Sequence, residues 1–266
     1  MASEFLDKIM LRQRQRMSAV SAAERASVEH AARERRASAR PHAFLASLAR
    51  RDRTSIIAEI KRSSPSAGVI CAAAELAPTV RRYEQSGAAA ISVLTEDVYF
   101  GGSLDDLRLA AQTVATPLLR KDFIVDRHQI FEAAAAGASA ALLIVAGLTE
   151  DELAALRQLI EDELAMDALV EVHSSAELKI AERTGARIIG VNNRNLQTMQ
   201  VSLDTSRELS SRKPAGALFV CESGLRTAAD IAGFKALGFD AFLIGEALMR
   251  SGDAAATLAE FVAVQS

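Results

Sequence analysis

Short apolar runs recur along the chain from residue 56 onward. Eight such runs, rich in Ile, Val, Leu and Ala, begin at positions 56, 88, 117, 140, 167, 188, 218 and 241. Each of the first seven is followed by a longer segment with helical spacing of its apolar residues, and "AAATLAEFVAVQS" supplies a last helix. Continuous apolar strands that alternate with helices indicate parallel strands covered on their outer face.

Glycines mark the ends of several of these predicted helices. Gly87, Gly137, Gly185 and Gly238 each precede a predicted strand, and glycine commonly ends a helix because it adopts the left-handed conformation without strain. An open doubly wound sheet should carry a glycine-rich fingerprint after its first strand, and this chain has none there. We therefore predict the α/β class, with a (β/α)8 TIM barrel.

The first 50 residues lie outside the repeat and have a helical pattern. Phe5, Ile9 and Met10 have helical spacing, so we expect this stripe to pack on the barrel near its mouth and help to close it. A helix that only adds stability is the alternative. We predict an N-terminal helical extension, residues 1–50, that packs on one catalytic barrel domain, residues 51–266.

The first strand carries charge where apolar residues are expected. It opens the stretch "IIAEIKRSSPSAG", residues 56–68, and alternation places Ile57, Glu59 and Lys61 on one face. A single pair of this kind is usually a structural ion pair at a barrel rim. However, polar residues also end other predicted strands, at the edge where barrels carry active sites: Arg120, Lys121, Asp122, Glu171, His173, Asn192, Asn193, Glu222, Ser223 and Glu246.

Two glycines suggest a phosphate site. Gly224 follows the seventh strand and Gly245 ends the eighth, and each precedes a predicted helix. Loops at these places in barrels commonly bind phosphate through backbone N–H groups and helix N-termini. A single glycine would more often serve only a tight turn, but two at the expected strand ends favour a phosphorylated substrate.

Composition excludes several other classes. The two cysteines and four histidines are scattered without metal-ligand spacing, so we expect no metal site and no disulfide framework. The net charge of -3 argues against a general nucleic-acid binder. No apolar run is long enough to span a membrane, and the charged N-terminus does not read as a signal peptide. We expect a cytoplasmic enzyme with no membrane or nucleic-acid partner.

These residues together resemble a known family. The stretch of residues 56–68 closely resembles the signature of indole-3-glycerol phosphate synthases. The match continues in that family's order through "LTEDVYFGGSLDDL", "PLLRKDFIVDRHQI", "ALLIVAGLT", "LVEVHSSAEL", "IIGVNNRNLQT", "CESGLRT" and "AFLIGEALM". The segment "FLDKIMLRQRQRM" is similar to the family's helical extension. The chain departs from the family in an Ala- and Arg-rich segment, residues 22–39, and in His128, where tyrosine is common.

The resemblance implies a reaction of tryptophan biosynthesis without metal or cofactor. Carboxyphenylamino-deoxyribulose phosphate would close its pyrrole ring and lose carbon dioxide and water, giving indole-3-glycerol phosphate. By similarity, Lys121 is the general acid and Glu171 the general base. Lys61 contacts the substrate carboxylate or acts in dehydration, and Glu59 orients Lys61. Asn192 and Ser223 complete the implied catalytic set by hydrogen bonding the substrate or the catalytic groups.

The same resemblance implies the substrate-binding residues. Ser64 in the first loop would meet the substrate, and an apolar wall would hold the aromatic ring. The full implied set is Ser64, Phe100, Phe123, Leu142, Leu196, Gly224, Leu243, Gly245 and Glu246.

The residues by themselves leave two other functions open. A related sugar-phosphate barrel, such as an isomerase of the same pathway, would share the glycines but would not need Glu59, Lys61, Lys121, Glu171 and Asn192 together. A barrel that binds a phosphorylated ligand or a protein without turnover is the other alternative. Other enzymes of the tryptophan pathway are candidate partners that the sequence neither selects nor excludes.

Overall fold

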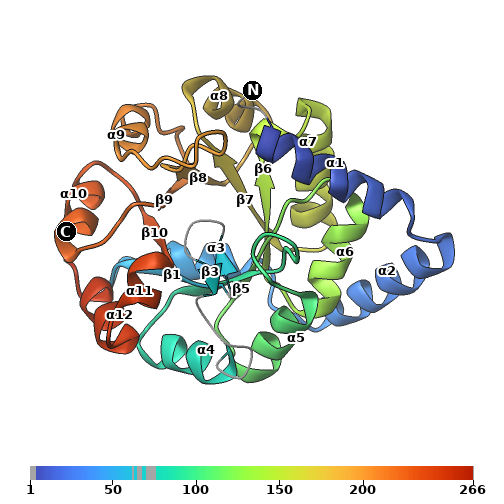
Figure 1. The fold of residues 1–266 in the computed structure, drawn as a ribbon, viewed down its shortest axis with the longest axis horizontal. Coiled ribbons are helices and arrows are strands. Elements are labelled where there is room, and N and C mark those ends of the chain that lie inside the picture. Colours follow the sequence, from blue (N-terminus) through green and yellow to red (C-terminus); the bar gives the residue numbers. More distant parts are fainter. Residues whose placement is uncertain (1–3, 62, 65–67, 70–75, 266) are drawn as a thin grey trace.

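Parallel strands form a closed barrel in the computed structural model, which describes residues 4–61, 63–64, 68–69 and 76–265 (Figure 1). Every strand of the barrel pairs in parallel with the barrel strands before and after it along the chain, and the last strand pairs with the first. The predicted (β/α)8 barrel is therefore confirmed. Its strands are β1 (Ser55–Ile60), β4 (Ala90–Leu94), β5 (Leu118–Lys121), β6 (Ala140–Ile144), β7 (Asp167–Val172), β8 (Ile188–Asn192), β9 (Leu218–Glu222) and β10 (Ala241–Ile244).

Helices surround the strands in Figure 1. The outer helices are α4 (Leu76–Gln85), α5 (Leu104–Thr113), α6 (Arg127–Ala136), α7 (Glu150–Gln158), α8 (Ser175–Arg183), α9 (Asp204–Ser210), α10 (Ala228–Ala236) and α12 (Ala254–Val262). The shorter elements are the hairpin β2 (Ser63–Ser64) and β3 (Gly68–Val69), the 3-10 turn η2 (Val145–Gly147), the π-helical turn η3 (Leu159–Glu163) and α11 (Glu246–Arg250).

Alternation along each strand separates two apolar clusters. On β1, Ile57 belongs to the cluster inside the barrel, whereas Ile56 and Ile60 belong to the cluster between strands and helices. Both clusters are buried, as expected for parallel strands that are covered on both faces. Glu59 therefore shares the inner face with Ile57, as the sequence pattern predicts.

Glycines end the helices where the sequence predicts. Gly87, Gly137, Gly185 and Gly238 have φ values of 90°, 99°, 76° and 95°. Gly137 shows the effect most clearly: it caps α6, and its N–H donates to the carbonyls of Ala133 and Ala134. This left-handed geometry turns the chain from the helix back into the next strand.

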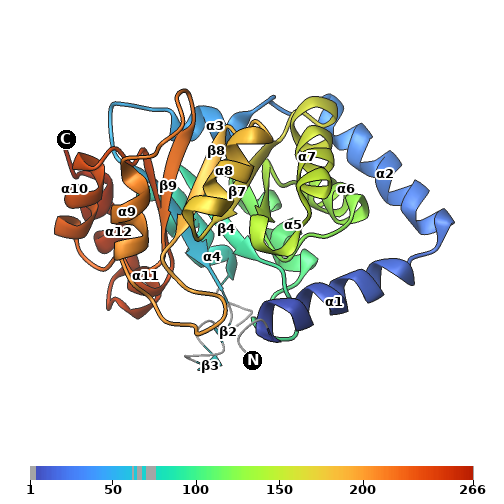
Figure 2. The same ribbon diagram turned by 90° about the horizontal axis from the view of Figure 1, so that it is seen from above.

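Three further helices precede the barrel. α1 (Glu4–Ser18) and α3 (Ala43–Leu48) lie at opposite ends of the barrel, and α1 is at the same end as the hairpin β2–β3 (Figure 2). α2 (Ala22–Ala37) connects them and packs along α6. On α3, Phe44 and Leu48 are buried in the inner cluster. The backbone N–H of Leu45 donates to Asp167 at the start of β7, over 2.9 Å, so α3 closes the amino-terminal end of the barrel.

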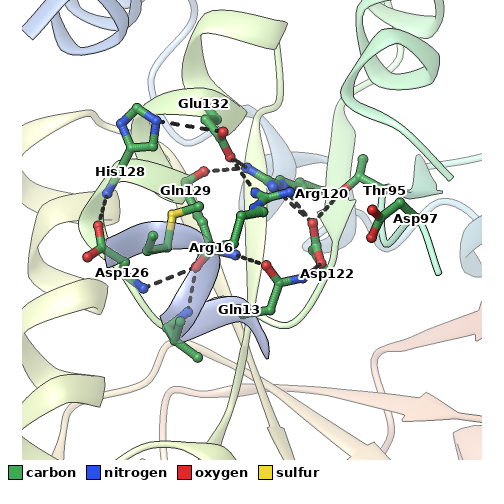
Figure 3. Close-up of polar contacts among 12 residues, drawn as sticks. Gln13, Arg16, Thr95, Asp97, Arg120, Asp122, Asp126, His128, Gln129 and Glu132 are labelled. Carbon is green, nitrogen blue, oxygen red and sulfur yellow. Dashed lines mark hydrogen bonds and ion pairs between the residues drawn. The ribbon is translucent and has the colours of Figure 1, made fainter. Parts of the chain in front are cut away.

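A buried polar network fastens α1 to β5 (Figure 3). Arg120 is fully buried, and its guanidinium donates to Asp122 over 2.9 Å and to Glu132 of α6 over 3.0 Å. The Gln13 amide of α1 reaches the other oxygen of Asp122 over 3.5 Å. Buried charges of this kind need partners, because water cannot solvate them. The network therefore holds the end of β5, next to Lys121, against both α6 and α1.

Candidate active site

A cavity of about 430 Å³ opens at the carboxyl ends of the strands. Every site residue predicted from the sequence lines it, except Ser64. The backbone of Ser64 is part of β2, but its side chain lies outside the described residues. The predicted residues that line the cavity are Glu59, Lys61, Phe100, Lys121, Phe123, Leu142, Glu171, Asn192, Leu196, Ser223, Gly224, Leu243, Gly245 and Glu246.

Lys121 makes the central ion pairs of the cavity. Its Nζ donates to Oε2 of Glu171 over 2.9 Å and lies 3.4 Å from Oε2 of Glu222. The three side chains come from β5, β7 and β9, and both carboxylates are almost completely buried. One ammonium thus serves two carboxylates from different strands.

Burial and charge set the protonation of these groups. Burial alone would lower the pKa of Lys121, but Glu171, Glu222 and Glu59 outweigh burial and raise it above the usual range. Burial would likewise raise the pKa of Glu171, but Lys121 and His173 outweigh it and lower that pKa. The pKa of Glu222 is raised to about 8. Burial is the main cause, and repulsion by Glu171 and Glu59 adds to it, whereas Lys121 opposes the shift.

The pKa values of the two glutamates therefore separate. The opposite directions favour an ionised Glu171, which can accept a proton, and a protonated Glu222, whose raised pKa of about 8 lies above neutral pH. Two carboxyl groups whose environments drive their pKa values apart are a common sign of acid–base chemistry.

Glu59 and Lys61 form a second ion pair at the end of β1. Nζ of Lys61 donates to Oε1 of Glu59 over 3.2 Å, and the exposed fractions of the two side chains are 13% and 9%. Glu59 is also one of the three carboxylates that raise the pKa of Lys121. The two lysines thus share one electrostatic environment.

The chain turns sharply after β9. Ser223 has a φ of 66°, in the left-handed region that only a few non-glycine residues adopt, and Gly224 follows with a φ of 87°. The Asn193 amide holds this turn by donating to the carbonyls of Glu222 and Ser223 over 3.0 and 3.1 Å. Strained residues held by their surroundings often occur at functional sites. Asn192 accepts from the backbone N–H of Arg194 over 2.9 Å.

Apolar side chains form one wall of the cavity. The rings of Phe100 and Phe123 are tilted, with centroids 6.4 Å apart. Phe5 of α1 lines the cavity as well and packs edge-on against Tyr99. Buried Glu96 fixes this loop, because it accepts from the backbone N–H of Phe100 over 3.1 Å and contacts Arg12 of α1 at 3.2 Å. Leu142, Leu196 and Leu243 complete the wall.

Positive charge lies at the outer edge of the cavity. Glu246 is partly exposed and lies 3.1 Å from Arg250 and 3.8 Å from Arg194. Both arginines line the cavity, and the sequence analysis did not select either. No group of three or more potential metal ligands occurs in the part of the chain that the structure describes.

Glu222 is the principal site residue to which the sequence analysis gave no role, although it named Glu222 among the polar strand ends. Alternation from Val220 places it inside the barrel, so the strand pattern contained a signal. Gly190 on β8 carries another: a Cβ there would lie 2.0 Å from Oε1 of Glu222. A glycine within a strand often marks such a close approach.

Comparison with known proteins identifies the family. The family model described as "Indole-3-glycerol phosphate synthase" matches residues 6–261. The chain belongs to the indole-3-glycerol phosphate synthase family. The synthase of Leifsonia xyli subsp. xyli is 47% identical over 225 residues, which cover 85% of this chain and 86% of that protein. The synthase of Lactiplantibacillus plantarum is 50% identical over 198 residues, covering 74% and 76%.

A solved structure supports the fold independently. The 3-hexulose-6-phosphate synthase of Salmonella typhimurium aligns with a TM-score of 0.61 over 79% of this chain and 97% of that one, at 12% sequence identity. This likeness is one of fold alone. Indole-3-glycerol phosphate synthases are carboxy-lyases of tryptophan biosynthesis that act on a small phosphorylated substrate. The resemblance found in the sequence is thus confirmed, and the two alternative functions are set aside.

Replacing Gly190 with alanine tests the packing around Glu222. The added Cβ must displace a carboxylate that is only 1% exposed. We expect Gly190→Ala to lower kcat at least about tenfold and to lower the free energy of unfolding by about 1–3 kcal/mol, as overpacking does. Steady-state formation of indole-3-glycerol phosphate and thermal unfolding measure both.

Gly233→Ala is the matched control. A Cβ at Gly233 meets nothing within 4 Å and lies in helix α10. We expect unchanged kcat and a stability gain of up to about 1 kcal/mol. Wild-type kcat in Gly190→Ala would contradict the importance of the Glu222 position.

Proposed function

We propose that the cavity converts carboxyphenylamino-deoxyribulose phosphate to indole-3-glycerol phosphate, with Lys121 as general acid and Glu171 as general base. The observation that supports this assignment is the contact of Lys121 with two buried carboxylates whose pKa values are shifted in opposite directions. A proton donor and a proton acceptor thus lie side by side in a site that is mostly shielded from water.

Ring closure requires an acid at the ketone. The aromatic carbon that bears the carboxylate attacks the ketone carbon, a C–C bond forms, and the ketone oxygen takes the proton of Lys121. Loss of carbon dioxide then returns an electron pair to the ring. Because the carboxylates hold the proton of Lys121 tightly in the free enzyme, the lysine must exchange its contact with Glu171 for one with the ketone oxygen.

Dehydration requires a base. Glu171 takes the proton from the carbon next to the ring nitrogen, and the new hydroxyl takes a proton from an acid, Lys61 or Glu222, and leaves as water. Lys61 contacts the substrate carboxylate or assists this step, and Glu59 orients Lys61 through its 3.2 Å contact. Glu222, whose pKa is raised to about 8, is placed to act as a second acid near Lys121.

The remaining residues bind the substrate. Phe100, Phe123, Leu142, Leu196 and Leu243 form an apolar wall that suits the aromatic ring. We assign the phosphate to the backbone around Gly224 and Gly245, at the carboxyl ends of β9 and β10. Ser64 contacts the substrate from the first loop. Asn192 and Ser223 hydrogen bond to the substrate or to the catalytic groups. Glu246 binds the substrate near its phosphate group.

The N-terminal helices pack on the barrel. We propose that residues 1–50 form an extension on the catalytic domain of residues 51–266, and that α1 closes the cavity mouth. Ile9 is completely buried, and Phe5 lines the cavity. Arg12 also reaches Asp97 in the loop after β4 over 2.7 Å.

The site suggests a small-molecule enzyme of the cytoplasm that has no nucleic-acid or membrane partner and needs no cofactor. Among the described residues, no helix is long and apolar enough to cross a membrane. Association with other enzymes of the tryptophan pathway would be compatible with this role.

Truncating the acid or the base should abolish most turnover. We expect Lys121→Ala and Glu171→Gln each to lower kcat about a hundredfold or more, with a smaller change in KM, because each removes a proton-transfer group. Indole fluorescence follows product formation. Lys179→Ala, on the exposed surface of α8, is the control. Near-normal turnover in Lys121→Ala or Glu171→Gln would refute the mechanism.

The phosphate assignment is tested with a modified substrate. A side chain at Gly245 would strike Glu59, since a Cβ there lies 2.6 Å from Oε1, so a variant would confuse binding with catalysis. The dephosphorylated substrate avoids this problem. We expect kcat/KM to fall on the order of a hundredfold, mainly through KM. A fall that occurs in kcat alone would count against a binding role for the phosphate group.

The role of α1 is tested with two alanine variants on one helix. Phe5 lines the cavity, whereas Leu11 is 59% exposed. We expect Phe5→Ala to raise KM about fivefold or more, as loss of roughly 1 kcal/mol of apolar contact predicts, and Leu11→Ala to leave KM unchanged. If Phe5→Ala lowers only the melting temperature, α1 merely adds stability.

A further inference from the structure

Glu171 faces two different cations. Its Oε2 accepts from Lys121 over 2.9 Å, and its Oε1 lies 3.3 Å from Nε2 of His173. His173 follows β7 directly and is not among the residues that line the cavity. It therefore contacts the proposed base without forming part of the cavity wall.

The imidazole is held between two carboxylates. Its Nδ1 lies 3.2 Å from Oε2 of Glu177 on α8, and the same oxygen accepts from the His173 backbone N–H over 2.8 Å. Ser174 fixes the other oxygen of Glu177 over 3.1 Å. A neutral imidazole has only one N–H, whereas the imidazolium has two. Nδ1 hydrogen bonds to Glu177, and Nε2 lies at ion-pair distance from Glu171 without an aligned hydrogen bond. A carboxylate oxygen beside each ring nitrogen fits the cation.

The proposed reaction requires a positive charge near Glu171 after Lys121 has given up its proton. Three buried carboxylates, Glu59, Glu171 and Glu222, lie near two lysines. When Lys121 gives its proton to the ketone, it becomes neutral and Glu171 loses its nearest positive charge. A buried carboxylate without a countercharge tends to take up a proton, and a protonated Glu171 could not act as the base of the next step.

We propose that His173 is a positioning residue, an imidazolium that keeps Glu171 ionised and oriented while Lys121 is deprotonated. The proposal rests on the proposed roles of Lys121 and Glu171. It adds a cation to the buried group of Lys61 and Lys121, placed where the reaction does not consume its charge.

The surroundings support a stable imidazolium. Burial would lower the pKa of His173, but Glu171 and Glu177 outweigh burial and raise it to about 10. These carboxylates come from β7 and α8; the other elements packed on this strand end, β6, β8 and η2, carry no titratable side chain. The cation is thus present at neutral pH and is lost only as the pH rises through about 10.

The first test compares His173→Gln with wild type from pH 3 to pH 8, because the lowered pKa of Glu171 places the acid limb of the wild-type profile below pH 5. Without the cation the pKa of Glu171 rises, so the acid limb of the kcat profile, where the base becomes protonated, should move to higher pH by about one unit or more. We expect kcat at neutral pH to fall about tenfold with little change in KM. His173→Lys, which keeps a charge, should restore part of the shift.

His30→Gln on the exposed face of α2 is the matched control and should match wild type. A merely structural role would lower the melting temperature of His173→Gln but leave the acid limb in place, and that result would overturn the proposal. It would leave the base assignment intact if Glu171→Gln is inactive. An active Glu171→Gln variant would instead refute the proposed function.

The second test observes the proton directly. Nitrogen-15 NMR of the imidazole rings, with His173→Gln to assign the signal, reports the charge of His173 independently of turnover. We expect both ring nitrogens to be protonated at pH 7 to 8. A neutral ring in that range would overturn the proposal even if the kinetic effect of His173→Gln were large.

Discussion

Each buried charge needs a partner of opposite charge, and this requirement determines how the side chains are arranged at the carboxyl ends of the barrel strands. Lys121, Glu171 and Glu222 come from three strands and are largely shielded from water. An isolated charge in such a place would be strongly destabilising. The strands must therefore deliver the charges as a set, and their shared environment sets which group holds a proton. Stability and reactivity depend on the same contacts.

The pattern of strands and helices made the fold predictable. Alternation along β1 placed Glu59 with Ile57 inside the barrel, and the glycines before the strands marked the helix ends. The same pattern brought the polar strand ends to one edge, whereas the resemblance to the synthase family supplied the apolar wall and the roles of single residues. These features depend on neighbours in sequence, which is why they can be read locally.

Contacts between distant strands could not be predicted in this way. Glu222 pairs with Lys121 and needs the space left by Gly190 only because closure of the barrel fixes the register of β5, β8 and β9. The partners of Arg120 come from its own strand end, from Thr95 after β4, from α6 and, through Asp122, from α1. No spacing rule links Gln13 to Asp122, since their approach depends on where α1 crosses the barrel.

Closure of the barrel also bears on how the enzyme is made. The first strand, β1, pairs with the last, β10, in addition to β4. During synthesis on the ribosome, β1 cannot pair with β10 until almost the whole chain has been made. Pairings between segments so distant in sequence form slowly. Glu59 and Lys61 remain at an open sheet edge until then. The edge of β1 that carries Glu59 and Lys61 is thus among the last parts of the sheet to gain a partner strand.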